Sequence, residues 1–231
     1  MSKLIWDTEK ERVYELGVDH GVLYLHGTTA GSQYSKAYAW NGLTAVNETP
    51  EGGEPNDHYA DNMKYFSLMS AENWSGTIEA YTYPDEFAEC DGSDAVAAGV
   101  YFGQQTRKPF GFSWRTKVGN AEDGDDAGYK LHLVYGCKVA PSDKNYETVN
   151  DSPEAVTFSW EVNSTPVSVP GYKPLSTIVI DSTKVDGTQL KKLEDILYGT
   201  DADTEAGTPA TEGRLPLPAE VYKLFTGKDP E

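Results

Sequence analysis

Cysteine is scarce in this chain of 231 residues, which contains only Cys90 and Cys137. Two cysteines are too few for a disulfide framework, and their spacing matches no zinc-binding motif. We therefore expect both thiols to be reduced and buried. Stability must come from side-chain packing instead, and the 15 tyrosines and 5 tryptophans supply large rings for a core.

Long apolar runs are also missing. The longest, residues 95–103, is far shorter than the about 20 residues that a membrane-spanning helix needs. The N-terminal residues reach Asp7 before any apolar stretch long enough for the core of a signal peptide. We expect a soluble protein without an export signal, made in the cytoplasm and independent of membranes.

Basic residues are few relative to acidic ones. The 37 acidic and 19 basic residues give a net charge of −18, and no Lys or Arg occurs between Lys64 and Arg107. Affinity for nucleic acid depends on Lys and Arg displacing counterions from phosphates, so this composition argues against specific nucleic-acid binding. The acidic surface either keeps the protein soluble or lets nucleic acid pass without sticking.

The sequence also lacks the common catalytic motifs: GxGxxG, the phosphate-binding loop, GxSxG and HExxH. The segment from Asp57 through His58 to Asp61 is the nearest approach to a metal site, but a solvated loop explains it better. The acidic turn at residues 122–126 lacks the ligand spacing of a calcium loop. Carboxylates within residues 85–94 could serve glycoside hydrolysis, which is the third-ranked hypothesis. We predict a protein that is not an enzyme and has no metal or cofactor.

Two long segments with period-two alternation dominate residues 129–162. The first places large side chains on one face: Tyr129, Leu131, Leu133, Tyr135, Cys137 and Val139. Its other face, with Val134 as the apolar exception, carries Lys130, His132, Gly136 and Lys138. The second segment alternates Val156, Phe158, Trp160 and Val162 with Ala155, Thr157, Ser159 and Glu161. This pattern predicts an antiparallel sheet with one face buried and the other wet or in contact with a partner.

Seven other segments are typical of strands: residues 12–16, 21–26, 37–40, 43–48, 59–69, 74–83 and 99–104. Residues 110–118 also alternate and lead through a Gly-rich and Asp-rich connection into the strand at Tyr129. The residues that we expect in the core are Trp114, Leu131, Leu133, Tyr135, Phe158, Trp160, Leu193 and Ile196. The fold class is therefore predicted to be mainly β.

The hydrophobic period changes near the C-terminus. Leucine and isoleucine at helical spacing predict a helix at residues 187–198, with Asp186 as its N-cap and Gly199 as its C-cap. Residues 1–199 are therefore predicted to form one β domain that ends in this helix. Residues 200–213, rich in Thr, Ala, Asp, Glu and Gly, indicate a flexible acidic loop, and residues 214–231 add a short helix and a tail.

Five stretches of the chain carry distinctive wording: GVDHGVLY (residues 17–24), AWNGLTAVNE (39–48), EAYTYPDEFAECDG (79–92), GQQTRKPFGF (103–112) and NDSPEAVTFSWE (150–161). Together with the helix region at residues 185–200, they resemble the major tail proteins of long-tailed, non-contractile bacteriophages that infect Gram-positive hosts. The resemblance extends over residues 1–225, although residues 200–213 match no motif of that family.

This resemblance implies a tail tube protein with two packed antiparallel β-sheets flanked by an α-helix. It implies hexameric rings that stack into a hollow tube, located in the virion tail and assembled in the host cytoplasm. The tube would enclose a tape-measure protein, meet tail terminator or tail tip proteins, and later conduct DNA without binding it specifically.

Three sets of residues are candidates for contacts in such a tube. The polar segment 48–58 suits an arm that reaches the adjacent ring, through Glu48, Glu51, Glu54, Asn56, Asp57 and His58. A cationic cluster could meet acidic residues of a neighbour within a ring: Arg107, Lys108, Arg115 and Lys117 against Asp85 and Glu86. The face predicted to be free could line the lumen or meet a neighbour, through Lys130, His132, Thr157, Ser159 and Glu161.

The alternative hypothesis is a β-sandwich that recognises a glycan or decorates a capsid surface. Exposed aromatic side chains, Tyr81, Tyr83 and Tyr101 among them, could stack on sugar rings in such a module. It would be a monomer or a small oligomer, whereas a tube protein would form rings.

Overall fold

The computed structural model describes residues 6, 12–27, 33–122, 124–148, 155–202 and 209–230. In chain order its strands are β1 (Val13–His26), β2 (Tyr34–Trp40), β3 (Leu43–Glu48), β4 (Pro55–Ala60), β5 (Met63–Met69), β6 (Ser75–Ala80), β7 (Asp94–Ala97), β8 (Val100–Phe102), β9 (Phe110–Asn120), β10 (Gly124–Val139), β11 (Phe158–Ser164), β12 (Thr177–Asp181), β13 (Gly199–Thr200) and β14 (Thr211–Glu212). The helices are the 3-10 helix η2 (Asp85–Glu89), α1 (Gly187–Tyr198) and α2 (Pro218–Thr226).

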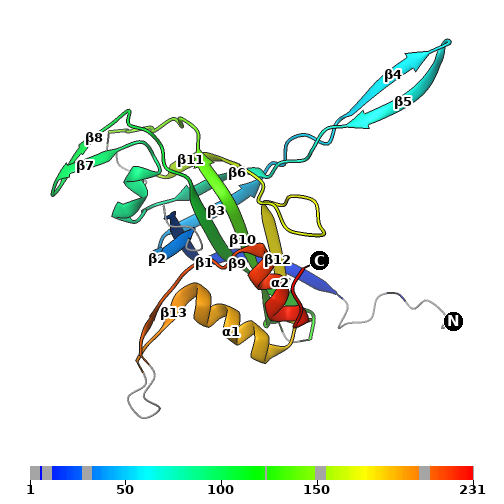
Figure 1. Ribbon diagram of the computed structural model, residues 1–231. Coiled ribbons are helices and arrows are strands. Elements are labelled where there is room, and N and C mark those ends of the chain that lie inside the picture. The colour runs from blue at the N-terminus through cyan, green and yellow to red at the C-terminus, as the bar shows by residue number, and fades with distance from the viewer. Residues whose placement is uncertain are drawn as a thin grey trace.

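An eight-stranded antiparallel sheet forms the body of the protein (Figure 1). Its strands follow the order β2-β1-β9-β10-β11-β6-β3, and β12 pairs with β10 as a branch. The sheet curls until its last strand returns to β1, where a Cβ atom on Gly21 would collide with the side chain of Leu43. The predicted mainly β fold with a flanking helix is confirmed, and its two layers are the two halves of one continuous sheet.

Strand β10 changes the face of its side chains at Gly136. Val134 lies opposite Phe112 and Cys137 lies opposite Phe110, so β10 carries one more residue than β9 between these two pairs. Such a β-bulge suits glycine, and Gly136 has a φ of 63°, with the carbonyl oxygen of Thr165 where a Cβ would be. Residues that follow Gly136 therefore point to the side opposite to the one that simple alternation predicts.

The bulge separates two hydrophobic cores on the two faces of the sheet. The inner core lies inside the curled sheet and consists of Leu23, Trp40, Trp74, Ile78, Ala80, Phe87, Cys90, Phe110, Phe112, Trp114, Val134, Cys137, Val139, Trp160 and Val162. The outer core lies between the sheet and the helices and consists of Val22, Tyr24, Tyr34, Leu131, Leu133, Tyr135, Ile180, Leu190, Leu193, Leu197, Leu215 and Val221. The prediction that one face of this sheet is wet is therefore wrong for β9 and β10.

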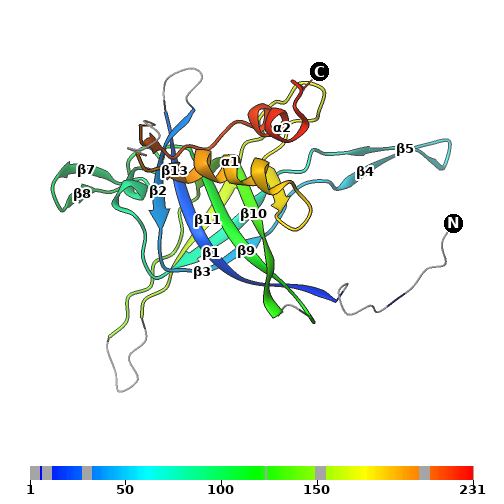
Figure 2. The ribbon, with the colours of Figure 1, turned by 90° about the horizontal axis from the view of Figure 1, so that it is seen from below.

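Helices α1 and α2 cover the outer core (Figure 2). Helix α1 begins and ends as predicted, and the carboxylate of Asp186 accepts hydrogen bonds from the backbone N–H groups of Thr188 and Gln189. Two buried phenols tie this layer to the sheet: the hydroxyl of Tyr24 donates to the carbonyl of Leu197 at 3.3 Å, and that of Tyr135 donates to the carbonyl of Pro216 at 2.9 Å. The helices are thus held by hydrogen bonds as well as by apolar packing.

Most of the residues predicted for the core are buried. Trp114, Leu131, Leu133, Tyr135, Trp160 and Leu193 are buried, but they divide between the two cores. Phe158 packs against the inner core while only partly buried, and Ile196 is half-buried, because Leu197 takes the inward position on α1. Both cysteines are buried as expected, and burial raises the pKa of the Cys90 thiol to about 12.

Two predicted segments have a different structure. Residues 59–69 are not one strand, because the chain turns at Asp61 and Asn62 to form the antiparallel pair β4–β5. Within the predicted loop 200–213, Thr200 pairs with Thr211 in the short β13–β14 ladder, and residues 203–208 lie outside the described part of the chain. Among the described residues, no helix is long and apolar enough to cross a membrane.

From the packing of the inner core we predict how much stability is lost when one aromatic ring is removed. The indole of Trp160 is fully buried and packs against Trp40, Phe87 and Tyr83 with ring centroids 5.2–5.5 Å apart. We expect Trp160→Ala to lower the free energy of unfolding by about 3–5 kcal/mol, out of a typical total of about 5–15 kcal/mol. Urea unfolding followed by fluorescence measures this change. Trp6→Ala, which removes an indole that is 76% exposed, is the matched control. A Trp160→Ala midpoint equal to that of the control would contradict the assignment.

Candidate interaction surfaces

The hairpin β4–β5 projects from the body as a long arm (Figure 1). We call residues 52–72 the arm. At its base the backbones of Glu51 and Asn73 exchange two hydrogen bonds of 2.8 and 2.9 Å, and Gly52 lies directly against the backbone of Ala71. At its tip, Asp61 and Asn62 both have positive φ, of 51° and 62°, as a two-residue hairpin turn with type I′ geometry requires. The arm is therefore a defined hairpin with its two ends held together.

One face of the arm is apolar. Opposite pairs in the ladder place Phe66 beside His58 and Met63 beside Ala60, and Leu68 follows on the same side. The rings of His58 and Phe66 are 4.8 Å apart, which confirms that they share this face. We call it the apolar face of the arm. Phe66, Leu68 and Met63 are all exposed on it, so the folded chain by itself leaves this apolar surface in water.

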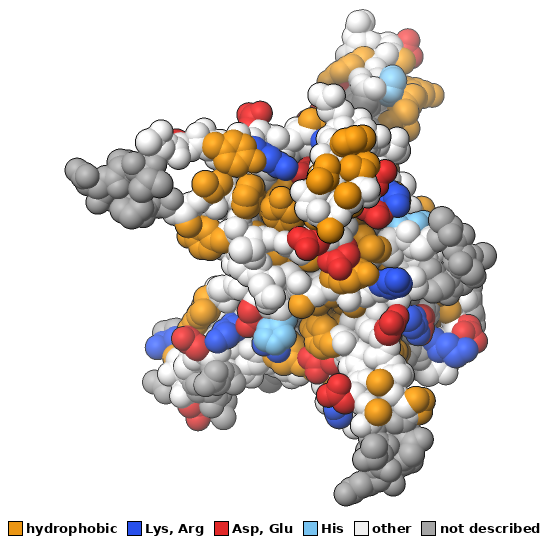
Figure 3. All heavy atoms as spheres, turned by 90° about the vertical axis from the view of Figure 1, so that its left-hand side faces the viewer, with side chains coloured by type: hydrophobic (Ala, Val, Ile, Leu, Met, Phe, Trp, Pro, Cys, Tyr) orange, Lys and Arg blue, Asp and Glu red, His pale blue; other side chains and the backbone are white. Residues whose placement is uncertain are grey.

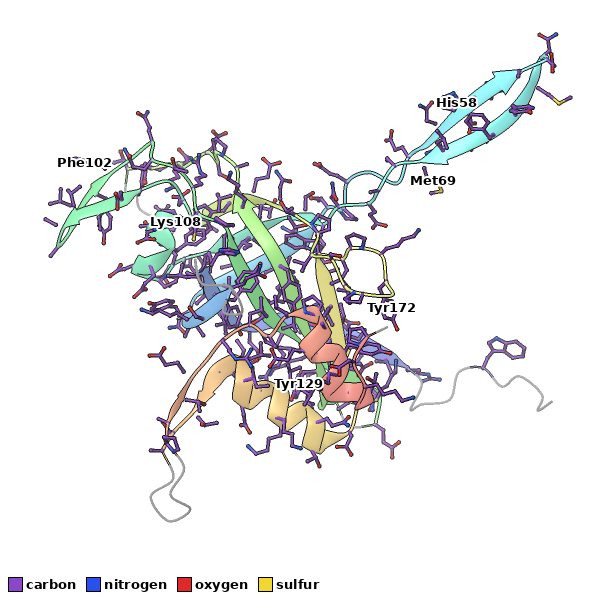
Figure 4. All side chains as sticks on the ribbon, viewed as in Figure 1. His58, Met69, Phe102, Lys108, Tyr129 and Tyr172 are labelled. Carbon is purple, nitrogen blue, oxygen red and sulfur yellow. The ribbon has the colours of Figure 1, made fainter. Side chains whose placement is uncertain are left out.

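The opposite face of the arm is more polar. There Asp57 accepts hydrogen bonds from Lys64 at 2.7 Å and from Ser67 at 2.6 Å, which together hold the pKa of its carboxyl below the usual value. Tyr59 lies on this face and is 70% exposed. Figure 4 shows His58 and Met69 on the arm, well away from the body. The two faces thus differ in chemistry on one slender element.

The residues predicted for contacts between rings divide along this arm. Glu48 ends β3, Glu51 clasps Asn73 at the base, and Glu54 lies just before β4. Asn56, Asp57 and His58 all belong to β4. The prediction of a polar loop at residues 48–58 was wrong in form, because the projecting element is a hairpin that extends to Met69 and carries an apolar face.

A second hairpin, β7–β8, projects from the opposite end of the body in both ribbon views (Figures 1 and 2). Its exposed hydrophobic side chains are Val96, Val100, Tyr101 and Phe102. Figure 3 looks onto this side of the molecule and shows hydrophobic side chains gathered there, with charged side chains around them. The chain therefore exposes apolar surface at two distant places.

A third apolar surface is a groove of about 380 Å³ beside helix α2. It lies between α2, strand β12 and the segment that precedes β12, and its apolar lining includes Val169, Tyr172, Leu175, Ile178, Val221 and Phe225. In the described part of the chain β12 pairs only with β10, so its other edge has no strand partner. The groove is thus bordered by an open strand edge, which is a typical place for another chain to add.

The predicted cationic cluster is not one cluster. Lys108 binds Glu89 of its own chain at 2.5 Å beside η2, and Arg107 is half-buried next to Gly92. Arg115 lies farther along β9, binds Asp19 at 2.9 Å and stacks over the ring of Tyr129 at 4.6 Å. Lys108 and Arg115 therefore already have acidic partners within their own chain, and the contact with a neighbouring chain stays a prediction.

The other residues predicted for the contact within a ring are Lys117, Asp85 and Glu86, and no ion pair within the described part of the chain involves them. Lys117 is exposed on β9, and no ion pair joins it to another described residue. Asp85 is exposed at the first position of η2, and Glu86 beside it is half-buried. These three residues could still meet a neighbouring chain, but they lie on separate elements.

The residues predicted to line the lumen fall into two groups with different surroundings. Lys130 is ion-paired with Glu15 of β1, and His132 is half-buried on the side of the inner core, so neither lies on a free face. Thr157, Ser159 and Glu161 behave differently. Thr157 is exposed just before β11, and Ser159 and Glu161, within β11, line an open polar hollow. Residues Glu79 and Thr77 lie opposite these two in the neighbouring strand β6. This acidic strip is the part of the predicted free face that remains.

His132 was predicted to lie on a free face of β10, but its ring packs against an aromatic residue of the inner core. Its ring is parallel to the indole of Trp114, with centroids 4.9 Å apart, and its Nε2 lies 3.1 Å from the hydroxyl of Thr116. Burial lowers the pKa of His132, whereas the carboxylates of Glu48 and Glu15 raise it by a smaller amount. The side chain is therefore part of the rim of the inner core.

The candidate metal-binding residues of the sequence do not gather in the described part of the chain. The described residues contain no group of three or more His, Cys, Asp or Glu side chains that could hold a metal ion. Asp57 and His58, the nearest approach to a metal site in the sequence, point to opposite faces of the arm. Of the acidic turn at residues 122–126, Asp123 lies outside the described residues. A scan against protein-family models finds no match, and no curated protein matches the chain at a significant level.

The sequence analysis did not predict the hairpin turn of the arm or its apolar face. The sequence does contain a signal for the turn. The adjacent Asp61 and Asn62 tolerate positive φ, so they indicate a hairpin turn between two strands. The apolar face was hidden because a bulge near Tyr65 shifts the pairing between β4 and β5. A shift of this kind cannot be read from alternation alone.

The buried position of His132 predicts a pH dependence of stability. Because its pKa is lowered in the folded protein, the unfolded chain binds a proton first as the pH falls below about 6.5. Stability is therefore unaffected by this group above that pH and decreases as the pH falls toward the lower folded value. The slope contributed by one such group is at most about 1.4 kcal/mol per pH unit.

Urea unfolding between about pH 7.5 and 5, a window around the unperturbed histidine pKa, tests this expectation. His132→Gln should flatten the decrease in the free energy of unfolding over that window. His58→Gln, which removes an exposed histidine from the arm, is the matched control. If the His132→Gln slope equals that of the wild type, His132 does not control this range.

Proposed function

We propose that this chain is a structural, non-enzymatic subunit of a bacteriophage tail tube, which self-associates into rings that stack into a hollow tube in the virion. The observation that carries the proposal is the arm with its exposed apolar face. The resemblance of the sequence to major tail proteins is the second support. The tube would enclose a tape-measure protein, end at tail terminator and tail tip proteins, and later conduct DNA.

The arm favours association because its apolar side chains stay in contact with water in an isolated subunit and therefore contribute no free energy of burial there. Phe66, Leu68 and Met63 are exposed on a hairpin that projects away from the described part of the body (Figure 1). Burying one side chain of this size contributes about 1.5–3 kcal/mol. A contiguous exposed apolar surface on a soluble protein commonly marks a site of protein association. A second copy of this chain is the partner that a ring or a tube requires.

The positions of the apolar surfaces favour a repeating assembly over a closed dimer. The arm and the β7–β8 hairpin leave opposite ends of the body, and the groove beside α2 is a third, separate place (Figure 1). Contacts between unlike patches of identical subunits generate rings or open stacks, whereas a two-fold dimer pairs a patch with itself. The open edge of β12 adds a strand edge that such an assembly could cover.

The charge of the chain agrees with a conduit for DNA. A net charge of −18 on each subunit disfavours contact with phosphates. The acidic strip along β6 and β11, which includes Glu79 and Glu161, is a polar surface that the helices do not cover. Such a strip suits a lumen through which DNA slides without specific binding.

The alternative function is a binding module for a glycan or a capsid surface. One observation favours the glycan: Tyr81, Tyr83 and Tyr101 line one cleft of the structure. The two functions are compatible in one chain, because the cleft and the arm are separate. The alternative becomes the better description only if the protein does not assemble.

The proposal predicts that the apolar face of the arm is needed for tube formation. Replacing both Phe66 and Leu68 by Ser should leave the subunit folded, since both side chains are exposed, and should abolish long tubes. The loss of two contacts, each worth about 1.5–3 kcal/mol, should prevent assembly at micromolar concentrations. Negative-stain electron microscopy detects tubes, and thermal unfolding checks the fold.

The matched control is Tyr59→Ser, which removes an equally exposed ring from the opposite face of the arm. We expect this variant to assemble better than the double variant. Deletion of residues 53–70, which joins the adjacent Gly52 and Ala71, should leave a folded subunit that forms no stacked tubes. Tubes of normal length from the deleted protein would refute the role of the arm, and wild-type protein that stays monomeric at every concentration would refute the tube.

A further inference from the structure

A cleft of about 400 Å³ opens between the end of β6, the helix η2, strand β8 and the segment that follows β10. Three tyrosines and one phenylalanine line it: Tyr81, Tyr83, Tyr101 and Phe158. Asp91 and Lys144 add charged groups, and the hydroxyls of Thr82 and Ser93 add polar ones. Its size falls in the range of about 300–1,000 Å³ that is usual for small-molecule sites.

One ring of the aromatic wall, that of Tyr83, is held in place by the inner core. The ring of Tyr83 packs edge-on against Phe158 at 5.4 Å and against Trp160 of the inner core at 5.3 Å. Tyr81 and Tyr101 are more exposed, so their rings remain available to a ligand. A ligand would therefore meet one ring held by the core and two at the open side.

The charged groups in the cleft are already paired with each other. The carboxylate of Asp91 accepts a hydrogen bond from the Nζ of Lys144 at 2.5 Å, and only 10% of the Asp91 side chain is exposed. Asp85, at the mouth, is exposed. A phosphate or another anion would find no unpaired cation here and would approach Asp85. A purely apolar ligand would leave the buried carboxylate and the hydroxyls without added partners.

We propose that this cleft binds an uncharged saccharide. A pyranose ring has an apolar face of C–H groups, which packs on an aromatic ring, and a rim of hydroxyls, which both donate and accept hydrogen bonds. The carboxylates of Asp91 and Asp85 accept such bonds, and the hydroxyls of Thr82 and Ser93 can do either. The cleft thus presents stacking surface and hydrogen-bonding groups side by side, as a sugar requires.

The site is independent of the proposed tube. Its lining comes from the segment that follows β6, from η2 and the turn after it, from β8, from the segment after β10 and from the first residue of β11, whereas the apolar face of the arm belongs to β4 and β5. Loss of sugar binding need not prevent assembly, and loss of assembly need not prevent sugar binding. A saccharide of a cell envelope or a polysaccharide in the medium would present the same chemistry to this cleft.

The test uses the full chain and three soluble probes: maltohexaose, cellohexaose and chitohexaose. Saturation-transfer NMR detects contact, and calorimetry measures affinity. We expect at least one probe to bind with a dissociation constant of about 0.1–1 mM, which is typical of a few stacking and hydrogen-bonding contacts. Tyr101→Ala should weaken that binding about tenfold by removing one stacking ring. Asp85→Asn should weaken it less, because the amide still accepts a hydrogen bond.

Tyr59→Ala, which removes an exposed tyrosine on the arm, is the control and should bind the sugar as the wild type does. All variants change exposed side chains, and thermal unfolding confirms that they fold. The proposal is overturned if none of the three probes binds the wild type at millimolar concentration, or if Tyr101→Ala binds as tightly as the wild type. If Tyr101→Ala instead abolishes tubes while no probe binds, the cleft is a contact between subunits and not a sugar site.

Discussion

The bulge at Gly136 is the constraint on which the rest of this structure depends. By adding one residue to β10, it turns the second half of the strand so that Cys137 and Val139 enter the inner core, while Leu131, Leu133 and Tyr135 remain in the outer core. The nearby backbone of Thr165 leaves no room for a side chain at this position. One long strand can therefore serve two cores and pair with β12 in its first half and β11 in its second.

Two cores on one curled sheet give the subunit a rigid body. Aromatic rings fill the inside, and buried phenols fasten the helices on the outside through hydrogen bonds to backbone carbonyls. Such a body can carry hairpins that make few contacts with it. The arm is held at its base by the clasp between Glu51 and Asn73, its own ladder pairs the backbone groups that face the partner strand, and the outward-facing groups can bind water.

Several cationic side chains are paired with acidic residues of the same chain. Cations that could have bridged to a neighbour are largely used within the subunit: Lys108 binds Glu89, Arg115 binds Asp19 and Lys144 binds Asp91. The Lys108–Glu89 pair is largely exposed, and a pair of this kind contributes only about 0–1 kcal/mol to stability. The other two pairs are partly buried. In the proposed assembly, contacts between subunits would depend mainly on apolar surface, which the arm, the β7–β8 hairpin and the groove beside α2 provide.

The sequence by itself determined the mainly β class, the helix α1 with its Asp186 cap and the burial of Trp160, because each follows from local periodicity or local hydrogen bonding. It also identified Tyr81, Tyr83 and Tyr101 as aromatic side chains available for contact. Only the tertiary structure decided that these three share one cleft, that His132 stacks on Trp114, and that Phe66 and Leu68 form an apolar face. The physical reason is that alternation fixes only which side chains share a face of one strand. The curl of the sheet, the strand pairing after the bulges at Gly136 and Tyr65, and the approach of loops are set by residues far away in the chain.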